Sequence, residues 1–141
     1  MGSLDIGGLP EGALVLVDSA PIIYIIEDHA TLATRFEPLF RAHASGALRI
    51  AVSTIAIAEV LVGPLRSGNR ALERRCNAVL LKWRSVPLSV EIAQSAARIH
   101  AATNLKLADA VQAASALAIG ADALVTHDRD FSRVKDLRII S

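Results

Sequence analysis

Four isolated acids stand next to the most apolar stretches of the chain. Asp18 directly follows the run ALVLV, and Asp128 comes just after the run DALVT. Glu59 lies among apolar neighbours in STIAIAEVLVG, and Asp109 lies near the start of LADAVQAASALA. In a parallel sheet, ligands bind beyond the carboxyl ends of the strands, where helices begin. All four acids can reach that edge, so we take them as the candidate catalytic residues.

The chemistry expected of such a cluster is metal-dependent hydrolysis. Carboxylates that converge without Lys or Arg nearby repel one another, which raises their pKa values. A divalent cation removes this cost, and ligands that are all oxygen suit Mg²⁺ or Mn²⁺ rather than zinc. We expect Asp18, Asp109 and Asp128 to bind metal, with Glu59 binding directly or through water. Such a centre activates water for attack on a phosphate ester, which predicts phosphodiester hydrolysis.

Three of the acids also have simple structural explanations. Asp18 suits the cap of a following helix, Asp109 suits the positive end of a helix dipole, and Asp128 suits a turn. Glu59 is the hardest to explain in this way. A carboxylate among apolar side chains is costly to bury without a partner, and no basic residue lies one helical turn away.

The pattern of apolar runs predicts an α/β fold. Strands are expected at residues 13–17, 48–52, 122–126 and 137–140, with an extended piece near residue 86. Helices are expected at 19–29, 34–45, 54–63, 69–83, 89–103 and 107–120, the third of them ending at Gly63. This alternation predicts a three-layer α/β/α domain with a mostly parallel central sheet. We assign residues 13–141 to that single domain and residues 1–12 to a loose segment whose MGS start resembles a cloning remnant.

Composition narrows the class of protein. The chain has 141 residues, of which 52% are hydrophobic and 21% charged, which argues against disorder. It has no apolar run of the ~18 residues that a membrane span needs, and its single cysteine cannot form an internal disulfide. We expect a cytoplasmic protein without a membrane partner. Arg70, Arg74 and Arg75 are candidates for RNA binding, although arginines along a helix most often form a solvated face.

Around the four acids, the sequence resembles the PIN-domain family and, within it, the VapC-like ribonuclease toxins of prokaryotic toxin–antitoxin pairs. The matching pieces are VLVDSAPIIYII, AVSTIAIAEVLVGPLR and LKLADAVQAASALAIGADALVTHDRDF. They span essentially the whole chain after the first dozen residues. The resemblance implies a PIN-like fold and a Mg²⁺- or Mn²⁺-dependent endoribonuclease. It would cut RNA with metal-activated water, leaving a 5′-phosphate and a 3′-hydroxyl.

The resemblance also implies roles for particular residues. The acidic residues carried over are Asp18, Glu59 and Asp109, with Asp128 as the fourth, and the supporting hydroxyl positions are Ser19 and Thr126. Two features depart from the family pattern. Many relatives have TND where this chain has THD, with His127 in the middle, and Asp130 is close enough to compete with Asp128.

The same resemblance implies protein partners. VapC-like toxins are usually neutralised by a cognate VapB-like antitoxin, whose tail lies in an apolar groove and covers the acidic site, and they are commonly homodimers. The helix from Leu72 to Trp83 and the LVGPL segment are candidates for that groove, and ordinary core packing explains both equally well.

Other classes of function fit parts of the pattern. A non-catalytic PIN-like module would bind RNA or protein without cutting. A phosphatase or flap-type DNA nuclease uses similar carboxylates, but the chain is short for a flap nuclease and no DxD follows the first strand. A phosphoacceptor receiver domain would need a lysine where this chain has Thr126 and His127.

Overall fold

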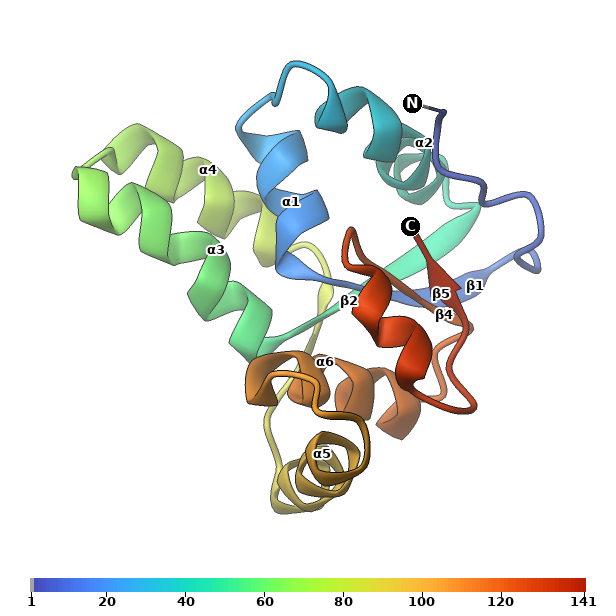
Figure 1. The fold of residues 1–141 in the computed structure, drawn as a ribbon. Helices are drawn as coiled ribbons and strands as arrows, with labels where there is room; N and C mark the ends of the chain where they lie inside the picture. Colours follow the sequence, from blue (N-terminus) through green and yellow to red (C-terminus); the bar gives the residue numbers. More distant parts are fainter. Residues whose placement is uncertain (1) are drawn as a thin grey trace.

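A five-stranded sheet forms the centre of the computed structural model, which describes residues 2–141 (Figure 1). The strand order is β3-β2-β1-β4-β5, and every neighbouring pair is parallel. The strands are β1 (Ala13–Val17), β2 (Leu48–Ser53), β3 (Arg84–Val86), β4 (Ala123–Val125) and β5 (Ile139–Ile140). The α/β prediction is therefore confirmed, and the carboxyl ends of β1, β2 and β4 meet at one edge of the sheet.

Six α-helices and one short 3₁₀ helix accompany the sheet. They are α1 (Ser19–Ile26), α2 (Leu32–Ala44), α3 (Thr54–Ser67), α4 (Arg70–Leu80), α5 (Val90–Thr103), α6 (Leu107–Ala118) and the 3₁₀ helix η1 (Arg129–Arg133). In Figure 1, α1 and α2 lie on one side of the sheet and α5 and α6 on the other, while α3 and α4 extend together to the left. None of the helices described for residues 2–141 combines the length and apolar character required to cross a bilayer.

The sheet separates two apolar cores because successive side chains of a strand point to opposite faces. Val15 and Val17 of β1 belong to the core on the α1–α2 side, which also contains the fully buried Phe36. Leu14 and Leu16 belong to the core formed with α5 and α6. All five residues of β1 are buried. A central parallel strand covered on both faces explains the uninterrupted apolar run in the sequence.

The end predicted for the third helix is wrong. α3 continues through Gly63 and Pro64 and ends at Ser67. A proline ring normally clashes with the β-carbon of a helical residue before it, and Gly63 has none. The residue that ends the helix is Gly68, whose φ of 68° lies in the left-handed region.

Smaller differences occur elsewhere. α1 ends at Ile26, before the predicted boundary, and Asp28 follows with a φ of 54°. α2 begins at Leu32 and accommodates Pro38 within the helix. α4 ends at Leu80, so Trp83 lies just beyond it. The 3₁₀ helix η1 was not anticipated.

The N-terminal segment is packed against the domain. Residues 2–12 form no helix or strand, but only 4% of Leu4 is exposed, and its backbone N–H donates a hydrogen bond to the Arg35 carbonyl at 2.9 Å. Leu4 belongs to the same core as Phe36, and Ile6 and Leu9 pack against that core. The segment is irregular but not loose, because its apolar side chains cover the α2 side of the domain.

Candidate metal centre

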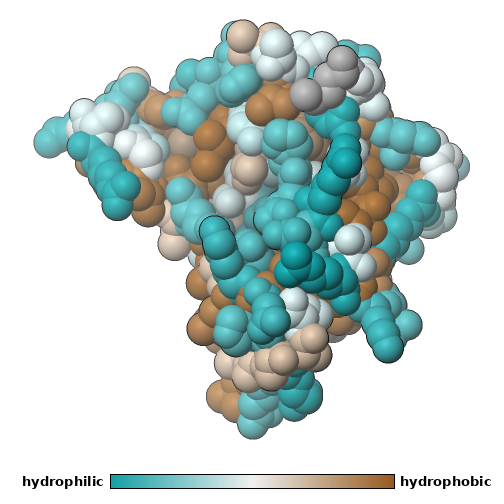
Figure 2. All heavy atoms as spheres, viewed as in Figure 1, coloured by the Kyte–Doolittle hydropathy of each residue, from teal (hydrophilic) through white to brown (hydrophobic). Residues whose placement is uncertain are grey.

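The four predicted acids line one pocket. Its volume is about 450 Å³, and it lies at the edge of the sheet where β1 and β4 end. Asp18 is the N-cap of α1, Glu59 comes from α3, Asp109 from the first turn of α6, and Asp128 from the N-cap of η1. The other lining residues are Ala20, Tyr24, Lys106, Ala108, His127 and Arg129. On the face of the molecule seen in Figure 2, hydrophilic side chains cover the middle, including the region of η1 and the side towards α3.

Asp18 is the most firmly held of the acids. Only 7% of the residue is exposed. Its Oδ1 accepts hydrogen bonds from the Ser19 backbone N–H at 2.8 Å and from Gln112 Nε2 at 3.2 Å, and its Oδ2 accepts one from Thr126 Oγ1 at 2.9 Å. Burial raises the pKa of Asp18, and the negative charge of Asp128 adds to this, while the three donors oppose it. No basic side chain donates to Asp18 among these contacts.

A chain of buried hydrogen bonds connects Asp18 to its surroundings. Gln112 is fully buried on α6, and its Oε1 accepts a hydrogen bond from Ser53 Oγ at 2.6 Å. On the other side, Thr126 Oγ1 accepts from the Asp128 backbone N–H at 3.0 Å. The hydroxyl of Thr126 therefore joins two of the acids. Sequence reasoning missed Gln112, although a polar residue in the apolar stretch AVQAA was a visible signal.

Glu59 and Asp109 are less buried. Glu59 is exposed at the pocket and does not point into the apolar core. The neighbouring protein atoms still shield its carboxylate from part of the solvent, which raises its pKa, and the charges of Asp18 and Asp109 raise it further. Partial burial also raises the pKa of Asp109, with further increases from the charges of Asp18 and Asp128. The acids therefore repel one another across the pocket, as the sequence predicted.

Two basic side chains also line the pocket, so the acids do not converge without Lys or Arg nearby. Lys106 and Arg129 line the same pocket, and the charge of Lys106 lowers the pKa of Asp109. They were missed because Lys106 lies just before α6 and Arg129 just after Asp128, outside the apolar runs that drew attention to the acids. Four carboxylates still outnumber two cationic side chains, so the pocket keeps an excess of negative charge.

His127 packs against two aromatic side chains beside the pocket. Its Nδ1 lies 3.0 Å from the hydroxyl of Tyr24. The His127 ring meets the rings of Tyr24 and Phe36 edge to face, with centroids 5.5 and 5.9 Å away. In the sequence THD, His127 therefore has an imidazole ring that packs against aromatic side chains, where the pattern TND would have the shorter amide side chain of asparagine. Like Lys106 and Arg129, Tyr24 is a pocket residue that sequence reasoning missed.

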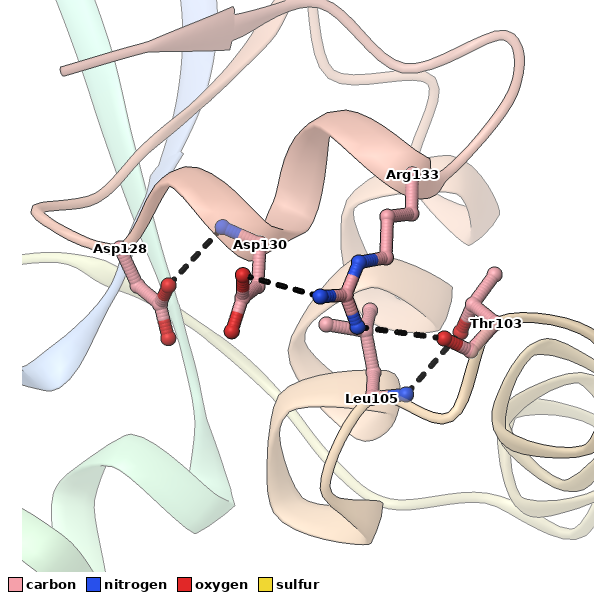
Figure 3. A network of polar contacts seen from close by, with 5 residues as sticks. All are labelled: Thr103, Leu105, Asp128, Asp130 and Arg133. Carbon is pink, nitrogen blue, oxygen red and sulfur yellow. Dashed lines mark hydrogen bonds and ion pairs between the residues drawn. The ribbon is translucent and has the colours of Figure 1, made fainter.

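The structure distinguishes Asp128 from Asp130. Asp128 lines the pocket, whereas Asp130 does not and instead forms an ion pair with Arg133 at 3.3 Å (Figure 3). The backbone N–H of Asp130 donates to Asp128 Oδ1 at 2.9 Å. This contact helps to fix the Asp128 side chain at the start of η1.

The predicted RNA-binding arginines are not at this pocket. Arg70, Arg74 and Arg75 lie on α4, and none of them lines it. Arg75 donates a hydrogen bond to the backbone carbonyl of Ile26 at 2.6 Å, which connects α4 to the end of α1. Lys106 and Arg129 are the cations that are present beside the acids.

The side chains of the pocket fit a hydrated divalent cation. Burial and mutual repulsion raise the pKa values of three acids, and a bound cation would relieve both effects. Within residues 2–141, no group of three or more acidic, histidine or cysteine side chains is placed so that it could hold a metal ion as a preformed ligand shell. Mg²⁺ commonly keeps several waters and binds through one or two carboxylates and substrate phosphates, so it does not need such a shell.

Comparison with known proteins identifies the family. The PIN domain family model matches residues 15–137, which is most of the chain, so the protein belongs to the PIN domain family. The matched region contains Asp18, Glu59, Asp109 and Asp128. No curated protein sequence gives a significant match.

Solved structures share the fold. VapBC2 from Rickettsia felis, bound to a DNA fragment from its promoter, aligns with a TM-score of 0.73 at 19% identity over 89% of this chain and 96% of that chain. A toxin–antitoxin complex from Klebsiella pneumoniae aligns with 0.71 at 22% identity, covering 90% and 96%. The sarcin-ricin loop cleaving toxin VapC20 from Mycobacterium tuberculosis aligns with 0.68 at 16% identity, covering 84% and 92%.

Proposed function

We propose that this PIN-domain protein is a divalent-metal-dependent endoribonuclease that acts as a VapC-like toxin. The observation that carries the proposal is the convergence of Asp18, Glu59, Asp109 and Asp128 on one open pocket at the carboxyl edge of the sheet. The similarity in fold to toxins and toxin–antitoxin complexes, one of which cleaves the sarcin-ricin loop, supports RNA as the substrate.

Each pocket residue has a role in this proposal. Asp18 already accepts three hydrogen bonds, which leaves about one of its roughly four acceptor sites for a metal ion. Asp109 and Asp128 are the other proposed ligands, and Glu59 orients the attacking water directly or as a ligand. Lys106 and Arg129 bind the oxygens of the phosphate. When bound, Mg²⁺ or Mn²⁺ would polarise the phosphodiester and lower the pKa of the attacking water.

A VapB-like antitoxin is the proposed partner. In the predicted groove segment from Leu72 to Trp83, the side chains of Cys76, Leu80 and Trp83 are buried in the core and cannot form a docking groove. In the LVGPL segment of α3, by contrast, Val62 and Leu65 are 42% and 59% exposed. These side chains are therefore the proposed contact for an apolar antitoxin segment. A homodimer and a cytoplasmic location complete the proposal.

The test is cleavage of RNA by the purified, partner-free protein. Total RNA is incubated with Mg²⁺ or Mn²⁺, with an EDTA control. We compare the wild type with Asp109→Asn, and with Asp136→Asn as the matched control. Asp136 is exposed outside the pocket, and its φ of 62° is one that asparagine tolerates.

Metal-dependent cleavage that falls by about 100-fold or more in Asp109→Asn supports the proposal, because groups that stabilise transition-state charge have effects of this size. Asp136→Asn should cut RNA like the wild type. If the folded protein cuts no RNA under any metal, a non-catalytic binding module becomes the better account. Cleavage of a phosphomonoester or of DNA alone would favour the phosphatase or DNA nuclease class.

A further inference from the structure

A second pocket lies beside the acidic one, between α5, α6 and the segment that follows η1. Its volume is about 420 Å³, within the range of small-molecule sites. Its lining combines cationic and apolar side chains. The cations are Arg98, Arg133 and Lys135, and the apolar side chains are those of Ile99, Ala102, Leu117 and Val134. We call this surface the cationic pocket.

Hydrogen bonds connect the cationic pocket to the acidic pocket (Figure 3). The N–H of Asp130 donates to Asp128, which lines the acidic pocket, and the Asp130 carboxylate pairs with Arg133. Arg133 also donates to the carbonyl of Thr103 at 3.4 Å, at the end of α5. The 3₁₀ helix η1 therefore carries Asp128 at one end and Arg133 at the other, so the two pockets share one short element.

Two of the three cations have no structural partner. The ion pairs found within residues 2–141 use Arg41 and Arg133. Neither the Arg98 side chain nor the Lys135 side chain forms a hydrogen bond or an ion pair in that part of the chain, and both residues are exposed. Arg133 is accounted for by its contacts with Asp130 and α5. Both side chains are therefore free to bind an anionic ligand beside the apolar lining of the pocket.

We propose that the cationic pocket is a subsite for a single-stranded segment of the RNA substrate, next to the segment that is cut. Phosphates bind Arg98 and Lys135, and a base packs on the apolar surface of Ile99, Leu117 and Val134. Single-stranded RNA presents alternating charge and flat apolar rings, which matches this lining. The inference rests on the proposed function, since it extends the path of the same strand across η1.

The test measures binding without cleavage. The anisotropy of a labelled single-stranded RNA oligonucleotide is followed at several salt concentrations in the Asp109→Asn background. The double variant Arg98→Gln/Lys135→Gln is compared with the charge-matched double variant Arg41→Gln/Arg49→Gln. Arg41 lies on α2, across the sheet from the cationic pocket, and Arg49 lies near the start of β2, away from the carboxyl edge.

Loss of two phosphate contacts should reduce the slope of log K against log salt by about 1.4, since each contact with a single strand contributes about 0.7. The same slope predicts about tenfold weaker binding near physiological salt. Each single variant, Arg98→Gln or Lys135→Gln, should reduce the slope by about half as much. The control double variant should leave the slope unchanged, and thermal melts should show that all variants are folded.

Three results would overturn the subsite, and they show whether the proposed function fails with it. Equal losses in the two double variants would overturn the subsite, because the effect would then be one of net charge. If Arg98→Gln/Lys135→Gln binds like its background while the wild type still cuts RNA, the subsite is also overturned and the proposed function stands. If the wild type neither binds nor cuts RNA, the proposed function fails and the subsite fails with it.

Discussion

Replacing Thr126 by valine tests whether its hydroxyl holds the acidic site together. The residue is fully buried, and valine keeps its shape. The change removes the donor to Asp18 Oδ2 at 2.9 Å and the acceptor of the Asp128 N–H at 3.0 Å. A hydrogen bond to a charged group contributes about 1.5–3 kcal/mol and a neutral one about 0.5–1.5 kcal/mol. Burial of the added methyl offsets about 0.8 kcal/mol.

The expected net loss is about 2–3 kcal/mol in the free energy of unfolding. At about 4 °C per kcal/mol for a domain of this size, the melting temperature falls by about 8–12 °C. Because the lost hydroxyl lowers the pKa of Asp18, removing it raises that pKa further. The difference from the wild type should therefore be largest above the Asp18 pKa and shrink below it.

Urea unfolding of the wild type, Thr126→Val and Thr126→Ser across a pH series measures this effect. Thr126→Ser keeps the hydroxyl and loses only a methyl, so it should cost about 1 kcal/mol with little dependence on pH. RNA cleavage should fall in Thr126→Val and survive in Thr126→Ser. A Thr126→Val protein as stable as the wild type at neutral pH, or a loss that does not change with pH, would refute the reasoning.

Three further predictions concern charge and backbone conformation. Without metal, the free energy of unfolding should fall as pH rises through the raised pKa values of Asp18, Glu59 and Asp109, because the folded state keeps these protons to higher pH than the unfolded chain does. In urea titrations across pH, Asp109→Asn should show a smaller fall than the wild type. Equal dependence on pH in the two proteins would contradict this prediction. Mg²⁺ at about one hundred times its dissociation constant should stabilise the wild type by about 2.7 kcal/mol, and calorimetry should show a smaller gain for Asp109→Asn. Gly68→Ala should cost about 1 kcal/mol, because Gly68 has a φ of 68°, and Gly68→Asn should cost less; unchanged stability in Gly68→Ala would argue against the left-handed helix end.

The layered fold and the position of the acids could be predicted because they depend on simple patterns. A central strand such as β1 is buried on both faces, so it reads as an uninterrupted apolar run, and the residue after it must lie at the edge of the sheet. Asp18 follows β1 directly, and Asp128 lies just beyond the end of β4. Glu59 and Asp109 could be placed because the helices that carry them begin near the same edge.

Other features depend on three-dimensional packing that no local pattern reveals. The hydrogen bond between Gln112 and Asp18 joins residues 94 positions apart, so the sequence shows only an unexplained polar residue in an apolar helix. The course of α3 through Pro64 was missed because the effect of Gly63 on its neighbour outweighs the usual meaning of Gly-Pro as a stop. Lys106 and Arg129 are near Asp109 and Asp128 in sequence, but only the folded pocket shows that their side chains line the same site as the acids.

The chemical identity of the new RNA ends tests the central claim most directly. If the pocket acids serve to activate water, fragments made by the wild type with Mg²⁺ or Mn²⁺ should carry a 5′-phosphate and a 3′-hydroxyl. The same cut should occur in an RNA with a 2′-deoxyribose at the cleaved position, since the 2′-hydroxyl takes no part. Fragments with a 5′-hydroxyl and a cyclic 2′,3′-phosphate, formed equally well in EDTA, would contradict the account, because the attacking group would then be the RNA's own hydroxyl.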